Sequence, residues 1–152
     1  MNNPYLIHGL QVGPVIVRRI VESVPVSRYD SHADPERFTL REAIAHLADW
    51  EEIDASRIRQ AVEHPGSILV PYDEVERAKE RGYDQTDLLE QLALYESRRQ
   101  DLLTYLAMLP TEAWSAEASH PEKGALTVYD QANLVLGHDT YHIEHLTQFL
   151  AL

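Results

Sequence analysis

Four long amphipathic segments, each bounded by proline or by a capping pattern, constrain the fold of this 152-residue chain most strongly. In each segment, apolar residues recur at the spacing of three and four that gathers them on one face of a helix. The segments cover residues 6–24, 39–64, 85–109 and 126–150. Pro25, Pro65 and Pro110 follow the first three, and proline cannot continue a helix. The pattern predicts an all-α four-helix bundle.

The helix ends and the connections refine this prediction. Thr39 with Glu42, and Thr127 with Asp130, have the spacing of capping boxes, so helices should begin there. Pro14 should either kink the first helix or mark its true start. The long connections after the second and third helices permit a crossover topology, and the first of them should hold a short helix around residues 73–81. No segment has a strand pattern.

Composition limits the classes of function. The chain has 25 acidic against 13 basic residues and a formal net charge of −12, which repels phosphate backbones and anionic membranes. We therefore expect no nucleic-acid and no membrane partner. No apolar run approaches the ~20 residues that span a bilayer, and the first residues lack the pattern of an export signal. With no cysteine and this length, a single domain over residues 1–152 in the cytoplasm is the expectation.

Three histidines of the last helix share one face. His138, His142 and His145 stand at offsets of zero, four and seven, which places them within about 60° of arc and toward the core. His46 lies in the apolar stripe of the second helix, between Ala43 and Trp50. Neutral imidazoles in an apolar core need partners, and a divalent cation accepts their lone pairs. We predict a metal site across the two helices; the alternative is a set of core histidines satisfied by hydrogen bonds.

Other readings of the histidines are weaker. The remaining four are expected to be exposed or in loops, namely His8, His32, His64 and His120. A zincin motif needs glutamate after the first histidine, where this chain has Asp139. A carboxylate-bridged di-iron bundle needs two Glu-x-x-His helices. Glu117 to His120 is the single match and falls in an expected loop. Neither template fits.

Two motifs resemble one family. Residues 39–51, Thr-Leu-Arg-Glu-Ala-Ile-Ala-His-Leu-Ala-Asp-Trp-Glu, are similar to the second-helix signature of the DinB-like (DinB/YfiT) metalloenzymes. Residues 138–143, His-Asp-Thr-Tyr-His-Ile, resemble the His-x-x-x-His of their fourth helix. The resemblance implies a bundle of unusual connectivity that holds zinc or nickel through His46, His138 and His142. It also implies a low-molecular-weight thiol as a possible cosubstrate, as in the family's S-transferases and mycothiol-dependent isomerase, and a homodimer.

The chain departs from the family pattern at His145, where glutamine is usual. His145 is a candidate fourth ligand, a hydrogen-bond donor behind the ligands or a proton-transfer group. Four further residues are candidates for handling protons, namely Glu42, Asp49, Asp139 and Tyr141. The resulting hypothesis is a metal-dependent thiol S-transferase or hydrolase acting on a small molecule. Its alternative is a non-catalytic metal-binding, structural or dimerisation bundle.

Overall fold

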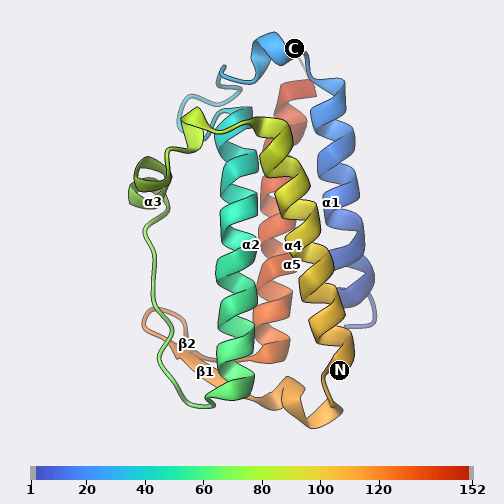
Figure 1. Ribbon diagram of the computed structural model, residues 1–152, viewed down its shortest axis with the longest axis vertical. Helices are drawn as coiled ribbons and strands as arrows, with labels where there is room; N and C mark the ends of the chain where they lie inside the picture. Colours follow the sequence, from blue (N-terminus) through green and yellow to red (C-terminus); the bar gives the residue numbers. More distant parts are fainter. Residues whose placement is uncertain (1–2, 151–152) are drawn as a thin grey trace.

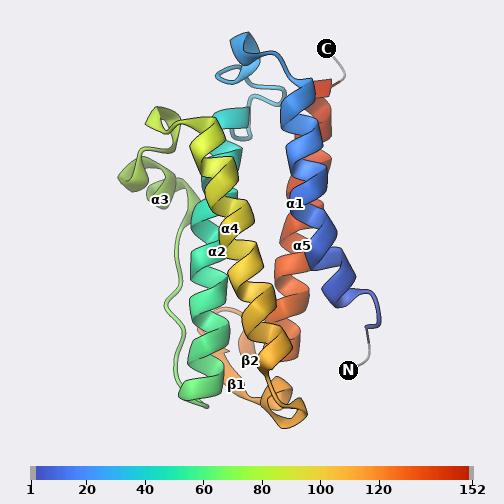
Figure 2. The ribbon, with the colours of Figure 1, turned by 45° about the vertical axis from the view of Figure 1, so that its right-hand side comes forward.

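Four long helices form the bundle that the sequence predicts, in a computed structural model that describes residues 3–150 (Figure 1). They are α1 (Leu6–Ser23), α2 (Leu40–Glu63), α4 (Leu88–Met108) and α5 (Val128–Thr147). Helices α2 and α4 run in one direction, and α1 and α5 run in the other (Figures 1 and 2). Each of α4 and α5 packs against both α1 and α2. The all-α fold class is confirmed.

The connection between α2 and α4 is a crossover, because these two helices are parallel and the chain must return along the bundle to start the second. It runs beside α2 in both ribbon views. It carries α3 (Glu74–Arg81), close to the predicted short helix, and the 3₁₀ turn η2 (Tyr83–Gln85). Asp49 of α2 anchors it, since the Tyr83 hydroxyl donates to Asp49 Oδ2 at 2.7 Å and Arg77 donates to both oxygens of this carboxylate. The segment is thereby fastened over one side of α2.

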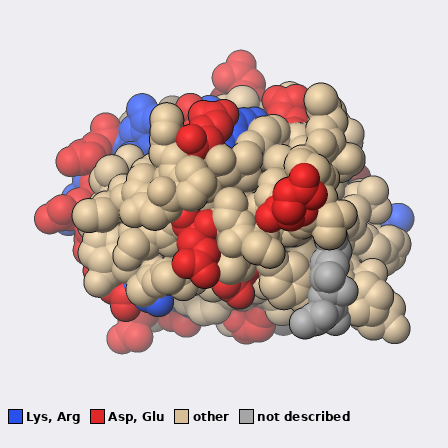
Figure 3. All heavy atoms as spheres, turned by 90° about the horizontal axis from the view of Figure 1, so that it is seen from below, with Lys and Arg blue, Asp and Glu red and all other residues tan. Residues whose placement is uncertain are grey.

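The connection between α4 and α5 contains strands, so the prediction of no strands is wrong. After the 3₁₀ helix η3 (Thr111–Ser115), β1 (Glu117–His120) pairs antiparallel with β2 (Gly124–Thr127). The backbone of Ser119 also bonds to residues 67 and 69 of the crossover. Strands of four residues are too short to show a clear alternation. Seen from this end of the bundle, uncharged residues cover most of the surface, with acidic side chains scattered among them (Figure 3).

The predicted helix ends are largely confirmed. Thr39 and Thr127 cap α2 and α5 through complete capping boxes with Glu42 and Asp130. Helix α1 continues through Pro14, which therefore does not mark its start. A 3₁₀ turn, η4 (Gln148–Leu150), extends α5. The sequence therefore predicted the ends of the long, capped helices to within a few residues.

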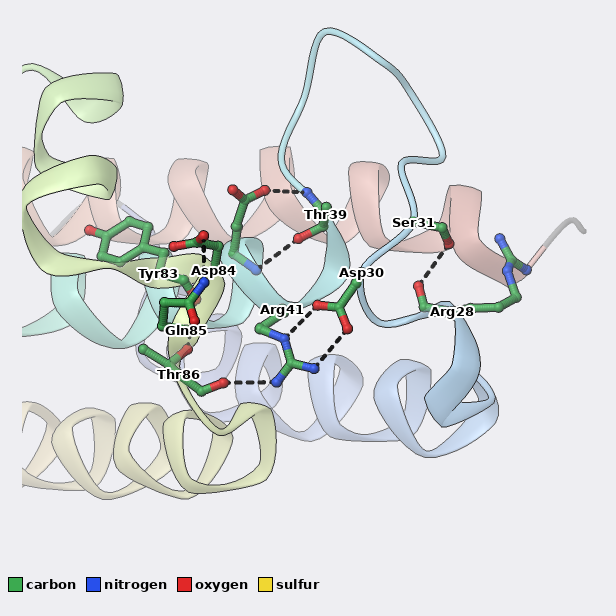
Figure 4. A network of polar contacts seen from close by, with 10 residues as sticks. Arg28, Asp30, Ser31, Thr39, Arg41, Tyr83, Asp84, Gln85 and Thr86 are labelled. Atoms are coloured by element: carbon green, nitrogen blue, oxygen red, sulfur yellow. Dashed lines mark hydrogen bonds and ion pairs between the residues drawn. The ribbon is translucent and has the colours of Figure 1, made fainter.

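Arg41 joins the two loops at the upper end of the bundle. The loop after α1, which includes the short 3₁₀ helix η1 (Val26–Arg28), meets the end of the crossover there. Arg41 Nε donates to Asp30 Oδ1 at 2.6 Å, and its Nη1 donates to the Thr86 carbonyl oxygen at 2.8 Å (Figure 4). These bonds hold both loops against the start of α2, one and a half turns before His46.

Among residues 3–150, no helix is both long and apolar enough to cross a bilayer.

Candidate metal centre

Three histidine side chains from α2 and α5 converge on one point, and we call them the histidine cluster (His46, His138 and His142). His46 stands two turns into α2, and His138 and His142 are one turn apart on α5. The Nε2 atoms of His46 and His138 are 2.9 Å apart, and those of His142 and His138 are 3.0 Å apart. One ligand atom from each ring lies within 4.8 Å of the others. The inward direction inferred for these rings is confirmed.

These distances suit one small cation. Bonds of ~2.0–2.1 Å from zinc to imidazole nitrogen, at tetrahedral angles, separate the nitrogens by about 3.3 Å. The observed separations of 2.9 and 3.0 Å differ by a few tenths of an ångström, which small side-chain rotations supply. Within residues 3–150, no other histidine, aspartate or glutamate ligand atom joins this group. The arrangement can hold a divalent ion and leave coordination positions open.

The protein keeps these rings neutral, as metal ligands must be. Burial, followed by the neighbouring His138, lowers the pKa of His46 to about 3. Burial lowers the pKa of His138 to about 4. Burial and the adjacent rings also lower the pKa of His142. The lone pairs at the convergence point are therefore available at neutral pH.

The surroundings of the cluster do not satisfy its nitrogens. Nδ1 of His46 and Nδ1 of His142 are buried and have no hydrogen-bond partner within residues 3–150. Trp50 lies beside His46 with its ring centroid 4.6 Å away, and Phe38 lies at 5.3 Å. These aromatic rings pack against the His46 ring and offer it no hydrogen-bond acceptor in their ring planes. Trp50, which belongs to the apolar stripe predicted for the second helix, is buried.

His145 lies outside the histidine cluster. Its ring centroid is 6.5 Å from that of His142, and the ring forms a hydrogen bond with the backbone of Phe38. Its Nε2 is buried without a partner among the described residues. Burial, followed by Arg37, lowers its pKa to about 4. The position fits a neutral ring behind the ligands better than a fourth ligand.

Asp139 faces away from the histidines, in a second buried cluster that we call the arginine network (Arg99, Glu51, Asp139 and Tyr95). Arg99 donates to both oxygens of Asp139 at 2.6 and 2.9 Å and to both oxygens of Glu51 at 2.6 and 2.7 Å. The Tyr95 hydroxyl donates to Asp139 Oδ1 at 2.8 Å. Asp139 therefore fixes the rotation of α5 beside His138 and does not face the convergence point.

The other proton-handling candidates occupy different settings. Glu42 closes the capping box of α2, and its carboxylate accepts from the Thr39 backbone N–H at 2.8 Å. Asp49 holds the crossover through Arg77 and Tyr83. Tyr141 is 58% exposed, with its ring 5.1 Å from that of His142. Tyr141 and Glu42 both line a pocket of about 300 Å³ that also includes His142 and His145.

A second cavity, of about 180 Å³, adjoins His138 and contains residues that sequence reasoning missed. His120 was expected to be exposed or in a loop, but it lies on β1 with 4% of its surface exposed and lines this cavity. Asp54, Arg57 and Gln131 also line it. Burial raises the pKa of Asp54 to about 7. Asp54 follows His46 and Trp50 at intervals of four, and this spacing was a signal for a polar group on the same face.

The three other histidines match their expectations where the structure describes them. His8 on α1 and His32 in the loop after it are exposed, and His64 is the exposed C-cap residue of α2. None of them joins the histidine cluster. The candidate centre therefore consists of the inward histidines of two packed helices.

Comparison with known proteins supplies independent findings. A model of the DinB superfamily matches residues 13–146. A "Putative metal-dependent hydrolase" of Oceanobacillus iheyensis is 25% identical over 134 residues, covering 88% of this chain and 77% of the relative. YfiT of Bacillus subtilis, with the same description, is 24% identical over 143 residues, covering 93% of this chain and 80% of YfiT.

Solved structures agree with the fold. YfiT, described as having an unusual four-helix bundle topology, aligns with a TM-score of 0.88 at 23% identity, covering 95% of this chain and 83% of YfiT. A mycothiol-dependent maleylpyruvate isomerase aligns with a TM-score of 0.77 at 15% identity, covering 93% of this chain and 59% of the isomerase. At these identities, the structural likeness concerns the fold alone.

Proposed function

The chain belongs to the DinB superfamily, and from this membership we propose that it is a divalent-metal-dependent enzyme acting on a small molecule. His46, His138 and His142 are the proposed ligands, and zinc or nickel is the proposed ion. The observation that carries this proposal is the convergence of three neutral imidazole rings from two helices, two of them buried and one, His138, half-buried. Relatives named as metal-dependent hydrolases support it.

A divalent ion in such a site supplies a nucleophile at neutral pH, because it lowers the pKa of bound water toward ~7 and deprotonates a bound thiol. Hydrolysis and transfer to a low-molecular-weight thiol are the two reactions that this chemistry supports. The chain's own residues keep the ligands neutral by burial, and Trp50 and Phe38 pack against the His46 ring. The half-buried His138 faces the 180 Å³ cavity, where substrate has access.

The alternative is a metal-binding bundle without catalysis, which would require a closed coordination sphere. His145 is the residue that would act as the fourth ligand in such a closed sphere. Its ring centroid lies 6.5 Å from that of His142, and this distance supports a site with open coordination positions instead. The homodimer, the cytoplasmic location and the single domain over residues 1–152 remain predictions from the sequence.

The test combines metal analysis with an activity screen. Protein purified without a polyhistidine tag should contain about one divalent ion per chain. His142→Ala should lose the ion, and His8→Ala, which changes an exposed histidine of α1, should keep it. The zinc- and nickel-loaded forms are then screened with ester and amide substrates, and with a panel of thiols and electrophiles. Equal metal content in both variants contradicts the proposed ligands, and an inactive, metal-loaded protein favours the non-catalytic alternative.

A further inference from the structure

Glu74, the first residue of α3, lines both cavities that reach the histidine cluster. It belongs to the cavity of about 180 Å³ together with His138, and to the pocket of about 300 Å³ together with His142. Among residues 3–150, no other residue lines both. The two cavities thus approach different ligands of α5, and the crossover residue that they share marks the boundary between them. A small molecule that enters either cavity passes this residue on its way to the cluster.

The anchor of the crossover holds Glu74 beside the turn of α2 that carries His46. Asp49 is three residues after His46, one turn along α2. Arg77 is likewise three residues after Glu74, one turn along α3. Arg77 Nη2 donates to Asp49 Oδ1 at 2.9 Å, and Arg77 Nε donates to the other oxygen of this carboxylate. The bonds fasten the first turns of α3 against this part of α2, and both ribbon views show α3 beside its upper half (Figures 1 and 2).

The Glu74 carboxylate is accessible and has no partner of its own. Glu74 is exposed, and no hydrogen bond or ion pair within residues 3–150 involves its side chain. Partial burial, followed by the charge of Asp73, raises the pKa of Glu74, although Lys123 opposes this shift. A carboxylate with a raised pKa is a stronger base. The side chain is therefore free to exchange a proton with a molecule in either cavity.

The other carboxylates near the cluster are engaged elsewhere or adjoin one cavity alone. Asp139 lies in the arginine network. Glu36 and Glu42 line only the larger pocket, and Glu42 is also held in the capping box of α2. Asp54 lines only the smaller cavity and stands eight residues beyond His46, which is about 12 Å along the axis of α2. The crossover carboxylate is thus the one that both cavities share.

We propose that Glu74 is a catalytic residue of the enzyme, whose carboxylate accepts the proton of the nucleophile at the histidine cluster. The O–H bond of water, or the S–H bond of a thiol, breaks, and its electron pair stays on the oxygen or sulfur. That atom bonds to the electrophilic carbon of the substrate, and the bond from this carbon to the leaving group breaks. Glu74 then returns the proton to the leaving group. The inference rests on the proposed function for the presence of the ion.

The first test locates the carboxylate, with azide as the probe and cobalt in place of zinc. Azide is an anion that binds at open coordination positions, and cobalt makes its binding visible in the absorption spectrum. Glu74→Gln removes a negative charge at almost unchanged size, so the dissociation constant of azide should fall about tenfold, the size of a unit-charge interaction across a partly hydrated site. Glu76→Gln is the matched control and should leave this constant unchanged, because Glu76 is exposed about 200° further round α3 and lines neither cavity.

The second test measures proton transfer, with zinc-loaded protein and 4-nitrophenyl acetate as the substrate. Glu74→Gln should lower kcat about 100-fold, the contribution of a positioned general base, and should leave KM and zinc content close to wild type. Glu74→Asp keeps a carboxylate that is one methylene shorter, and it should recover part of the lost kcat. A residue with a merely structural role would show neither the selective loss in kcat nor this recovery. Glu76→Gln should match the wild type in every value.

Equal azide dissociation constants in the wild type and Glu74→Gln, or equal kcat values, overturn the inference. Loss of zinc in Glu74→Gln also overturns it, because Glu74 would then be a ligand and not a base. Failure of the proposed function has a different signature, since the wild-type protein then takes up neither cobalt nor zinc. Failure of this inference alone leaves a metal-loaded, azide-binding protein on which Glu74→Gln has no effect.

Discussion

His138 and Asp139 are neighbours on α5, yet they belong to two buried polar clusters of opposite character. In the arginine network, Arg99 bonds to both carboxylates and also donates to the Leu10 carbonyl oxygen at 2.8 Å. In the histidine cluster, nitrogens approach to 2.9 and 3.0 Å, and two outer Nδ1 atoms have no partner within residues 3–150. The polar atoms of the arginine network bond to one another, whereas the histidine cluster leaves two outer nitrogens unpaired among the described residues.

The electrostatics follow the same division. Burial opposes the charge of Arg99, but its hydrogen bonds to Glu51 and Asp139 raise its pKa overall. Burial lowers the pKa of the three clustered rings, and no carboxylate beside them reverses this. In the arginine network one guanidinium is hydrogen-bonded to two carboxylates, so removing it would leave both without their cation. Neutral rings with unpaired nitrogens are instead suited to bind an ion. Asp139, on one side of α5, thus belongs to a hydrogen-bonded network, and His138 and His142, on the other side, belong to the proposed metal site.

The largest expected effect is on the arginine network. Arg99→Met leaves Glu51 and Asp139 buried without their cation, and we expect the free energy of unfolding in urea to fall by about 3–5 kcal/mol. Arg18→Met is the matched control, because Arg18 pairs with Glu96 on the surface, where a pair contributes about 0–1 kcal/mol. Similar losses in the two variants would contradict the structural role of the network.

The histidine cluster should respond in the opposite manner. His46→Ala should reduce zinc affinity, measured by competition with a chelator, at least about 100-fold. Even the loss of a group that only hydrogen-bonds to a ligand costs about 10–100-fold. The metal-free variant should lose less than about 2 kcal/mol of stability, because His46 Nδ1 has no partner within residues 3–150 and His138 Nε2, which His46 contacts, keeps His142 Nε2 at 3.0 Å. Global unfolding of His46→Ala would instead indicate a structural ion.

The sequence predicted the histidine cluster better than the arginine network, for a physical reason. Helical periodicity fixes which way a side chain faces, so His46, His138 and His142 could be assigned to the core from their spacing. The arginine network depends on how helices α1, α2, α4 and α5 pack against one another. The sequence alone therefore suggested a different role for Asp139, that of a proton-handling group near the metal. Pairing between helices is not encoded in the period of any one helix.

The hairpin and the cavity were missed for a related reason. His120 is buried because β1 packs beneath the crossover, where Leu69 N–H donates to the Ser119 carbonyl oxygen at 2.9 Å. Four-residue strands carry little pattern, and their burial depends on a segment some fifty residues earlier. The cavity-lining residues Asp54, Arg57 and Gln131 likewise acquire their meaning only when α2 and α5 are placed side by side.

Gly13 offers a sharper test of how tightly the network is packed. A Cβ at this position would lie 2.5 Å from Asp139 Oδ2, an atom that Arg99 holds in place. Gly13→Ala should therefore lower stability by about 1–3 kcal/mol through overpacking. At Gly137, also inside a helix, nothing lies within 4 Å of the added Cβ, and Gly137→Ala should raise stability by up to about 1 kcal/mol. Thermal unfolding of the two variants measures both changes in stability. If both variants were stabilised, Asp139 and Arg99 would have to move aside for the added Cβ, and the tight packing of the network would be contradicted.

We expect the smallest effect from substitution of His145, which tests whether this residue belongs to the proposed ligand set. Burial holds its pKa at about 4, below the ~6.5 of an unfolded chain. Above pH 6.5 the ring is neutral in both the folded and the unfolded chain, so it does not reduce stability there. Between pH 6.5 and 4 the unfolded chain binds a proton that the folded chain does not, and the free energy of unfolding falls as the pH falls. At pH 5 the loss amounts to about 2 kcal/mol for one ring. His145→Gln should remove this part of the acid sensitivity of the metal-free protein, measured by urea unfolding at pH 5 and 7.5, and should leave zinc content close to wild type. A large loss of zinc would show that His145 is a ligand. The coordination sphere would then be closed by four histidines, which contradicts the proposed open site.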